Sequence, residues 1–175
     1  MDLDRPLAPD PYAKLPPVPS FALVSDDIAD GATMAEPFTA AEDVSPHLAW
    51  DEFPHQTASF LVTCFDPDAP RPQGFWHWTV VDLPSDTTEL PRGAGSPRGT
   101  LLPPGAYQLT NDSGTTGYVG AWPPPGDRVH RYFFAVHALD VAHLEADVAS
   151  EPRDVALEAA KHTLARAVVV PVFRR

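Results

Sequence analysis

The sequence predicts a mostly β protein, an antiparallel β-sandwich with one or two short helices. Many short apolar segments, rich in β-branched and aromatic residues, alternate with turn residues along the chain. Helical periodicity is convincing only near the C-terminus.

The chain is organised around two apolar segments joined by a short acidic loop. Ser59 to Phe65 is apolar on both faces, as in a strand inside a sandwich core, and Phe75 to Asp82 has the same character. The prolines of the intervening segment 66–72 cannot continue a strand ladder, because each fixes φ and lacks an N–H. We therefore expect a stiff loop that holds Asp66 and Asp68 at a strand end.

The second of these strands carries a histidine inside an aromatic run. A period of two puts Trp76 and Trp78 on one face and His77 on the other. One interpretation is a core histidine that hydrogen bonds to backbone or to a nearby aspartate. The other is that two carboxylates and an imidazole converge on one small site.

The N-terminal part of the chain divides into an arm and the start of the domain. Residues 1–20 hold six prolines and no hydrophobic period, so we expect an extended arm beside a single domain at 21–175. Strands are expected at Phe21 to Ser25 and at His47 to Trp50. The segment 32–46 between them should be a loop with a short strand.

Loops and two more strands are expected after the central stretch. Pro84 to Pro104 is rich in turn residues and poor in apolar ones, which predicts a long loop outside the core. Tyr107 to Thr110 should form a brief strand. The glycine and proline density of 118–126 predicts a fixed loop whose backbone comes close to other groups. His130 to Asp140 should be a long apolar strand.

The helix near the C-terminus has recognisable start signals. Ser150 can cap it and Pro152 suits its first turn. Apolar residues then recur at three to four positions on one face, which should lie on the sheet, at Val155, Leu157, Ala160, Leu164 and Val168. Residues 168–170 return to strand character.

Composition limits the classes of function. The chain has 175 residues, 43% of them hydrophobic, which suits one domain with a good core. No apolar run reaches the roughly 20 residues of a membrane span, and the N-terminus lacks a signal region, so we expect a cytoplasmic protein. A formal charge of −12 argues against nucleic acid as a partner. The single cysteine, Cys64, should be a small core residue.

Several motifs in order resemble the phosphatidylethanolamine-binding protein family, specifically its bacterial Raf-kinase-inhibitor-like branch. They are SPHLAW at 45–50, FDPDAP at 65–70, FWHW at 75–78 and VGAWPPPGDRVHRYFFAVHALD at 119–140. The resemblance covers most of the chain. It implies a Greek-key β-sandwich with a small anion pocket at one end, lined by Asp66, Asp68, Pro70, His77, Tyr118, Gly120, Trp122, His130 and Tyr132.

The residues present suit an anion pocket in an acidic protein. Imidazole N–H groups of His77 and His130, with backbone N–H groups near Gly120, can meet a phosphate-like oxygen without a net positive charge on the chain. The aspartates would orient the histidines, which is our preferred role for Asp68, or meet the ammonium of a zwitterionic headgroup. Asp66 and Asp68 can also simply cap the loop.

The chain departs from its relatives at Trp122. Bacterial members tend to have glycine, proline and a small residue before the prolines, where this chain has Gly120-Ala121-Trp122. An indole there would lie over the pocket mouth and exclude bulky headgroups, or would pack outward against the prolines that follow.

The leading hypothesis is a binding protein without a cofactor. It would hold a small anionic or zwitterionic ligand, phosphorylated or carboxylated, or dock a kinase or protease at the pocket rim, and we expect a homodimer. The alternative is a small-molecule enzyme that uses the Asp/His pocket for acid–base chemistry. A metal site built from His77, His130 and an aspartate is a further alternative, although no ligands are closely spaced.

Overall fold

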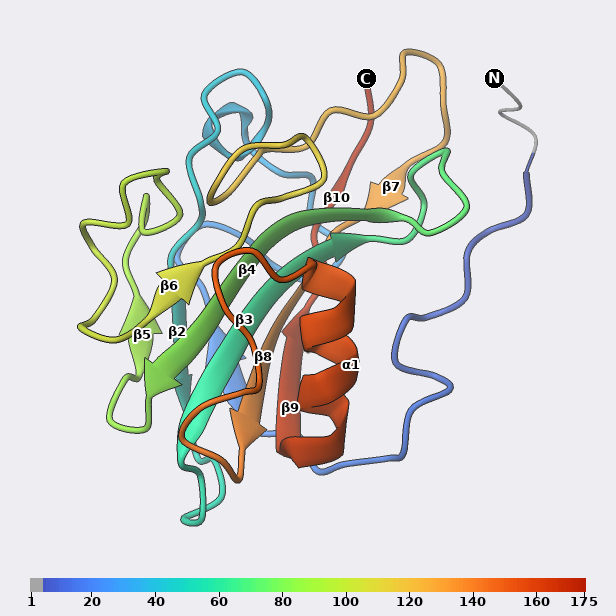
Figure 1. Cartoon of the computed structure of the whole chain (residues 1–175). Coiled ribbons are helices and arrows are strands. Elements are labelled where there is room, and N and C mark those ends of the chain that lie inside the picture. Colours follow the sequence, from blue (N-terminus) through green and yellow to red (C-terminus); the bar gives the residue numbers. More distant parts are fainter. Residues whose placement is uncertain (1–4) are drawn as a thin grey trace.

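The computed structural model describes residues 5–175 and is a mostly β structure with one α-helix in that range (Figure 1). Every pair of its strands is antiparallel, which confirms the predicted fold class. In chain order the elements are β1 (Ala22–Val24), a 3₁₀-helix (Glu36–Phe38), β2 (Leu48–Asp51), β3 (Ser59–Asp66), β4 (Phe75–Pro84), β5 (Glu89–Leu90), β6 (Tyr107–Gln108), β7 (His130–Arg131), β8 (Phe133–Leu139), α1 (Pro152–His162), β9 (Thr163–Val169) and β10 (Val172–Phe173).

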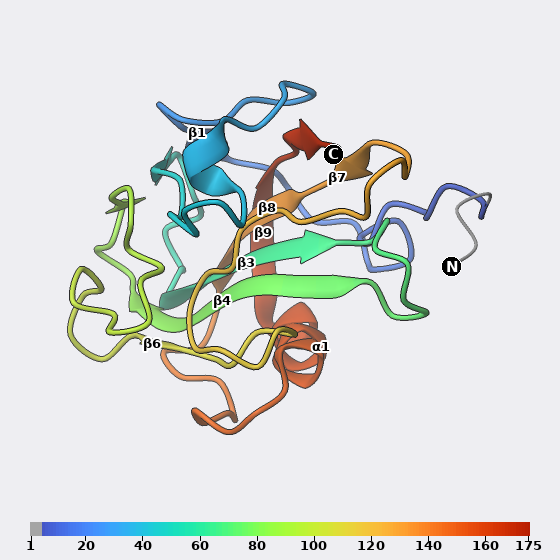
Figure 2. The same cartoon turned by 90° about the horizontal axis from the view of Figure 1, so that it is seen from above.

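The central layer is a five-stranded sheet in the order β6-β4-β3-β8-β9. One face packs on the small sheet β1-β2-β5, where Phe60 and Val62 of β3 join Trp50 of β2 in the main core. The other face packs on α1, where Leu61 of β3 meets Val155 in a second cluster. Figure 2 shows α1 and β1 on opposite sides of β3 and β4. Both faces of β3 are therefore buried, as its apolar sequence predicts.

A bulge in β4 alters the expected alternation around His77. Cys64 of β3 pairs with Trp78, whereas the next residue, Phe65, pairs with Trp76, so His77 is an extra residue on β4. Trp76 consequently lies on the α1 face, where it shares a cavity with Phe65, while Trp78 lies in the main core. The prediction that the two indoles share a face was wrong, because a bulge shifts the period of two by one residue.

The long strand expected at 130–140 is two strands. Its first residues form β7, which pairs with β10, and β8 then joins the central sheet. The break falls at Tyr132, whose backbone N–H donates to the carbonyl of Pro171 at 3.0 Å.

The helix begins and ends differently from the prediction. Its N-cap is Glu151, and Ser150 hydrogen bonds to Asp147 in the preceding turn instead of capping. The helix ends at His162, and Leu164 belongs to β9. The helical spacing of apolar residues continued to Leu164 and Val168 only by coincidence. These residues belong to β9, whose inward-facing residues fall on alternate positions.

Two loops contain more structure than the sequence indicates. A 3₁₀-helix stands where a short strand was expected within 32–46. The segment 84–104 contains β5, and Leu90 and Ala94 are fully buried, so this loop contributes to the core. No helix within residues 5–175 has both the length and the apolar character needed to cross a bilayer.

The loop at 118–126 does come close to other backbone, as its glycine content predicts. Thr39 and Ala121 form a parallel bridge, and a Cβ added to Gly120 would lie 2.1 Å from the carbonyl carbon of Thr39. Only glycine therefore fits at this position.

We predict that Gly120→Ala lowers the free energy of unfolding by about 3 kcal/mol, because the methyl group must push two backbones apart. Gly31→Ala is the matched control: Gly31 has φ +68° and open space around it, so the cost there is about 1 kcal/mol from the backbone conformation alone. Urea unfolding measures the free energy of unfolding of both variants. Equal losses in the two variants would contradict the close approach.

Candidate functional site

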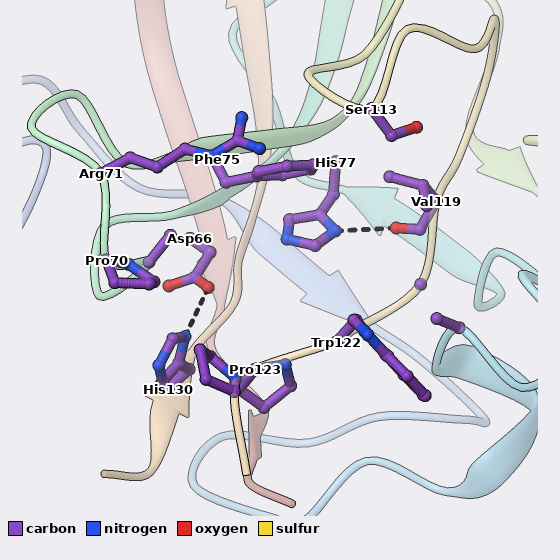
Figure 3. Close-up of a pocket in the computed structure, with 14 residues that line it drawn as sticks. Asp66, Pro70, Arg71, Phe75, His77, Ser113, Val119, Trp122, Pro123 and His130 are labelled. Atoms are coloured by element: carbon purple, nitrogen blue, oxygen red, sulfur yellow. Dashed lines mark hydrogen bonds and ion pairs between the residues drawn. The ribbon is translucent and has the colours of Figure 1, made fainter. Parts of the chain in front are cut away.

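A cavity of about 440 Å³ lies where β3 ends and β4 begins. Six residues predicted for the pocket line it, namely Asp66, Pro70, His77, Gly120, Trp122 and His130. Figure 3 shows the His77 and His130 rings on the walls of this one cavity. The volume is within the range of small-ligand sites. The sheet thus brings together residues that are 64 positions apart, such as Asp66 and His130.

Three predicted residues stand behind the cavity instead of lining it. Tyr118 donates its hydroxyl to the carbonyl of Phe38 at 2.7 Å. Tyr132 packs edge-on against His77 with ring centroids 5.2 Å apart, and burial raises the pKa of its phenol far above the ordinary value. Asp68 is buried and is bound by Arg131.

His130 is held between two carboxylates. Its Nδ1 lies 2.7 Å from Oδ2 of Asp66, and its Nε2 lies 3.0 Å from Oδ2 of Asp127. Because a carboxylate only accepts, both ring nitrogens must carry protons, and the ring is an imidazolium. Burial opposes this charge, but the hydrogen bonds and charges of Asp66 and Asp127 outweigh it and raise the pKa of His130.

Asp127 is a central residue that the sequence did not single out. Its side chain is buried and accepts from both terminal nitrogens of Arg5, at 3.0 and 2.8 Å, as well as from His130. These contacts, that of Arg5 first, hold the pKa of Asp127 well below its ordinary value. Its position three residues before His130 was the only signal in the sequence, and it follows a proline-rich turn that drew no attention to it.

Asp68 does not orient a histidine, contrary to our preferred role for it. Its carboxylate accepts from Nε of Arg131 at 2.7 Å and from Nη2 at 2.9 Å. Asp66, the other loop aspartate, binds the imidazole instead. Asp66 is the last residue of β3, whereas Asp68 lies in the turn that follows, where its carboxylate meets Arg131 of β7.

The charged groups at and behind the His130 wall of the cavity balance one another. The carboxylates of Asp66, Asp68 and Asp127 face His130, Arg131 and Arg5, and these six groups have a formal net charge of zero. This arrangement, here called the charge network, removes the repulsion that the acidic loop would otherwise exert on an anion.

His77 is in the opposite state to His130. It is buried, and its Nδ1 donates to the carbonyl of Val119 at 2.8 Å. Burial lowers its pKa, an effect that outweighs the opposing influence of Asp66, the Val119 carbonyl and Asp112. The ring is therefore neutral, and Nε2 carries a lone pair. No residue in 5–175 donates a hydrogen bond to this nitrogen.

Arg71 is a second residue that the sequence analysis missed. It lines the cavity, with its guanidinium 4.8 Å from the centroid of the Phe75 ring. Figure 3 shows Arg71, Phe75 and His77 layered along one wall. One N–H reaches the carbonyl of Asp112 at 3.4 Å, so other donors of the guanidinium remain for a ligand.

The expected backbone donors near Gly120 are already engaged. The Gly120 N–H donates to Asp43 at 2.7 Å, and the Val119 N–H donates to the carbonyl of His77 at 3.0 Å. Protein acceptors thus occupy these backbone donors and both ring nitrogens of His130, so their role in holding an anion stays a prediction from the sequence. His77 and Arg71 line this part of the cavity together with Phe75 and Ser113.

Trp122 lies at the rim. Its side chain lines the cavity, is 62% exposed and has the guanidinium of Arg175 3.6 Å from its ring centroid. The indole therefore neither seals the mouth nor packs entirely away from it. Within 5–175, no three His, Cys, Asp or Glu side chains are arranged to hold a metal ion.

The chain matches the protein-family model described as phosphatidylethanolamine-binding protein over residues 24–174. Among curated proteins, it is 43% identical over 157 residues to the UPF0098 protein YbhB of Escherichia coli strain K12, a match that covers 86% of this chain and 98% of YbhB. A UPF0098 protein of Aquifex aeolicus is 40% identical over 134 residues, covering 77% of this chain and 76% of that protein.

Solved structures give the same result. The crystal structure of E. coli YbcL, described as a new member of the mammalian PEBP family, aligns with a TM-score of 0.86 and 39% identity, covering 89% of this chain and 99% of YbcL. A phosphatidylethanolamine-binding protein from Plasmodium vivax aligns with a TM-score of 0.60 at 14% identity, covering 90% and 87% of the two chains, and thus shares the fold.

We predict that Asp127→Asn destabilises the protein by roughly 2 kcal/mol near pH 5, because the imidazolium loses a charged acceptor. The pKa of Asp127 is depressed on folding, so this contribution is present above its unfolded pKa and fades as the pH falls below about 4. His130 has a raised pKa, so its contribution is present below about 6.5 and is lost as the pH rises through the folded value.

Urea unfolding of the wild type and Asp127→Asn between pH 2 and pH 9 tests this profile, and NMR titration should give a lower His130 pKa in the variant. Asp86→Asn removes an exposed carboxylate and is the charge-matched control. An unchanged His130 pKa in Asp127→Asn would rule out the clamped imidazolium.

Proposed function

Because the chain belongs to the phosphatidylethanolamine-binding protein family, we propose that its 440 Å³ cavity binds the anionic group of a small phosphorylated or carboxylated ligand, such as a phospholipid headgroup. The observation that carries this proposal is the free Nε2 of His77 beside the guanidinium of Arg71 on a wall of the cavity. The charge network behind the opposite wall is already neutral, so it neither attracts nor repels the ligand strongly.

The state of His77 determines how an anion can bind. A neutral ring offers an acceptor at Nε2, which suits a proton-bearing oxygen and is unfavourable for a bare anion. After protonation the same nitrogen becomes a charged donor. The ligand must therefore bring a proton with it, as a monoprotonated phosphate does, or raise the pKa of His77 so that the ring takes one from water.

Arg71 complements this histidine because it remains charged at any ordinary pH. It extends from the proline-rich loop over the Phe75 ring, which leaves it exposed and within reach of a group in the cavity mouth. Arg71 would attract the anion. His77 would bind a protonated anion through its neutral ring, and a fully ionised anion only after the ring itself has taken up a proton.

Binding accounts for these features better than catalysis does. Both nitrogens of His130 are occupied by carboxylates, so it is not poised to exchange protons with a substrate. Burial raises the pKa of the Cys64 thiol and thereby disfavours the reactive thiolate. A kinase or protease partner, a cytoplasmic location and a homodimer stay predictions from the sequence.

We predict that affinity for sulfate increases about tenfold for each unit by which the pH falls toward the His77 pKa, and then levels off below it. Sulfate keeps its two charges across this range, so the protonation being measured belongs to the protein. The groups that surround His77 and act on its pKa are Asp66, Asp112 and His130. Isothermal titration calorimetry from pH 5 to pH 8 provides the profile.

His77→Gln should remove the slope, and His55→Gln, which changes an exposed histidine elsewhere, should keep it. Arg71→Ala should weaken sulfate about tenfold at every pH while leaving the slope intact. A flat profile in the wild type, or a slope that survives in His77→Gln, would exclude this mode of anion binding.

The indole at the rim leads to a prediction about ligand size. If Trp122 narrows the entrance, Trp122→Gly should raise affinity for phosphorylethanolamine about threefold or more and leave inorganic phosphate within about twofold. Trp122→Phe keeps a ring and should resemble the wild type. Calorimetry measures the affinity of each variant for both ligands. Equal changes in the two affinities in Trp122→Gly would mean that the indole does not select ligands by size.

A further inference from the structure

A second cavity, of about 320 Å³, lies on the other face of the central sheet. Its floor is formed by β3 and β4, where Phe65 and Trp76 pack with ring centroids 4.6 Å apart. Helix α1 and the N-terminal arm form its walls. The bulge at His77 turns Trp76 to this face, so the feature that directs His77 into the first cavity also builds the second.

The arm wall is fixed by Tyr12. The guanidinium of Arg166 lies 4.3 Å from the centroid of the Tyr12 ring. The ring also packs edge-on against Phe133 and His137, at centroid distances of 6.3 and 5.8 Å. Burial raises the pKa of this phenol to about 12, so it is neutral at ordinary pH. The arm is therefore a packed wall, held further by the Pro19 carbonyl, which accepts from the Arg166 N–H at 2.9 Å.

The helix wall combines apolar contact with one cation. Arg153, Ala156 and Leu157 line the cavity and are spaced three and four residues apart, which puts them on one face of α1. Leu157 is 54% exposed, so this face is open at its edge. Arg153 is exposed and forms no ion pair within 4 Å among residues 5–175.

The buried polar group of the cavity is His137. Nε of Arg166 donates to its Nδ1 at 3.3 Å, so in the neutral ring the proton must be on Nε2. His137 is only 4% exposed and lines the cavity, and no residue in 5–175 accepts a hydrogen bond from its Nε2. Burial, together with Arg166, lowers the pKa of His137 to about 3, which keeps the ring neutral. It is therefore a neutral donor without a hydrogen-bond acceptor in the part of the chain that the structure describes.

We propose that this second cavity is a binding site for a small aromatic carboxylate, whose ring packs against Tyr12 and Trp76, whose carboxylate meets Arg153 and whose far end accepts a hydrogen bond from His137. The three aromatic side chains favour a flat apolar ring. The Arg153 guanidinium at the open edge, which has no ion pair among residues 5–175, selects an anion, and the buried N–H of His137 selects an acceptor. This site does not rest on the function proposed for the first cavity, because the two lie on opposite faces of the sheet.

The probe is 4-hydroxybenzoate, which has a flat ring, a carboxylate and an oxygen at the opposite end. Quenching of tryptophan fluorescence and calorimetry measure its binding, with saturating sulfate present to fill the first cavity. We expect saturable binding at one site. Affinity should fall about tenfold for 4-hydroxybenzyl alcohol, which lacks the charge, and acetate, which lacks the ring, should not compete.

Two variants locate the site. Ala156→Phe fills the cavity and should abolish binding of 4-hydroxybenzoate, and a wild-type circular dichroism spectrum with a cooperative urea transition would demonstrate that this variant folds. Arg153→Ala changes an exposed residue and should weaken binding about fivefold, because exposed ion pairs contribute modestly. Arg98→Ala, an exposed arginine that does not line the cavity, is the matched control and should leave affinity unchanged.

Four results would overturn the proposal. The first is the absence of saturable binding in the wild type. The second is binding that survives in Ala156→Phe, and the third is equal weakening by Arg153→Ala and Arg98→Ala. Competition by sulfate would instead assign the probe to the first cavity and would equally contradict a second site.

Discussion

The His130 imidazolium between two buried carboxylates is the interaction on which the site end of the protein depends. It joins the end of β3, through Asp66, to the loop before β7, through Asp127, and Arg5 adds the N-terminal arm to the same group. Removing any one partner would leave a charge buried without compensation, which is costly in a protein interior. The charge network therefore behaves as one unit that fixes the back of the first cavity.

Because both ring nitrogens of His130 are hydrogen bonded to carboxylates, His77 is the histidine of this cavity that can still change its protonation state when a ligand binds. The two rings lie on the walls of one cavity (Figure 3), yet one is charged and fully bonded, while the other is neutral with a free nitrogen. The difference arises from their partners: carboxylates surround the first ring, and a carbonyl oxygen meets the second. Environments that separate two equivalent groups in this way are the usual means by which proteins assign different roles to them.

The central sheet uses both of its faces, and the bulge at His77 links them. The extra residue directs an imidazole to the first cavity and rotates Trp76 to the α1 face, where a second cavity lies. The N-terminal arm contacts both regions, with Arg5 at the charge network and Tyr12 in the wall of the second cavity. The N-terminal arm, for which the prolines indicated only an extended conformation, thus contributes one residue to the charge network and another to the wall of the second cavity.

The sequence by itself determined the β class, the two central strands and the acidic loop, because apolar alternation and proline chemistry are local properties of the chain. Motif order, which is also read along the chain, identified Asp66, His77 and His130 as residues of the cavity. The tertiary structure alone decided the partners: Asp127 and Arg5 are 122 positions apart in sequence and meet only after folding. It also decided the bulge that separates Trp76 from Trp78, the end of the helix at His162 and the use of the Gly120 N–H by Asp43. Each of these depends on which backbone groups meet across the fold, and a pattern along one chain carries no record of that.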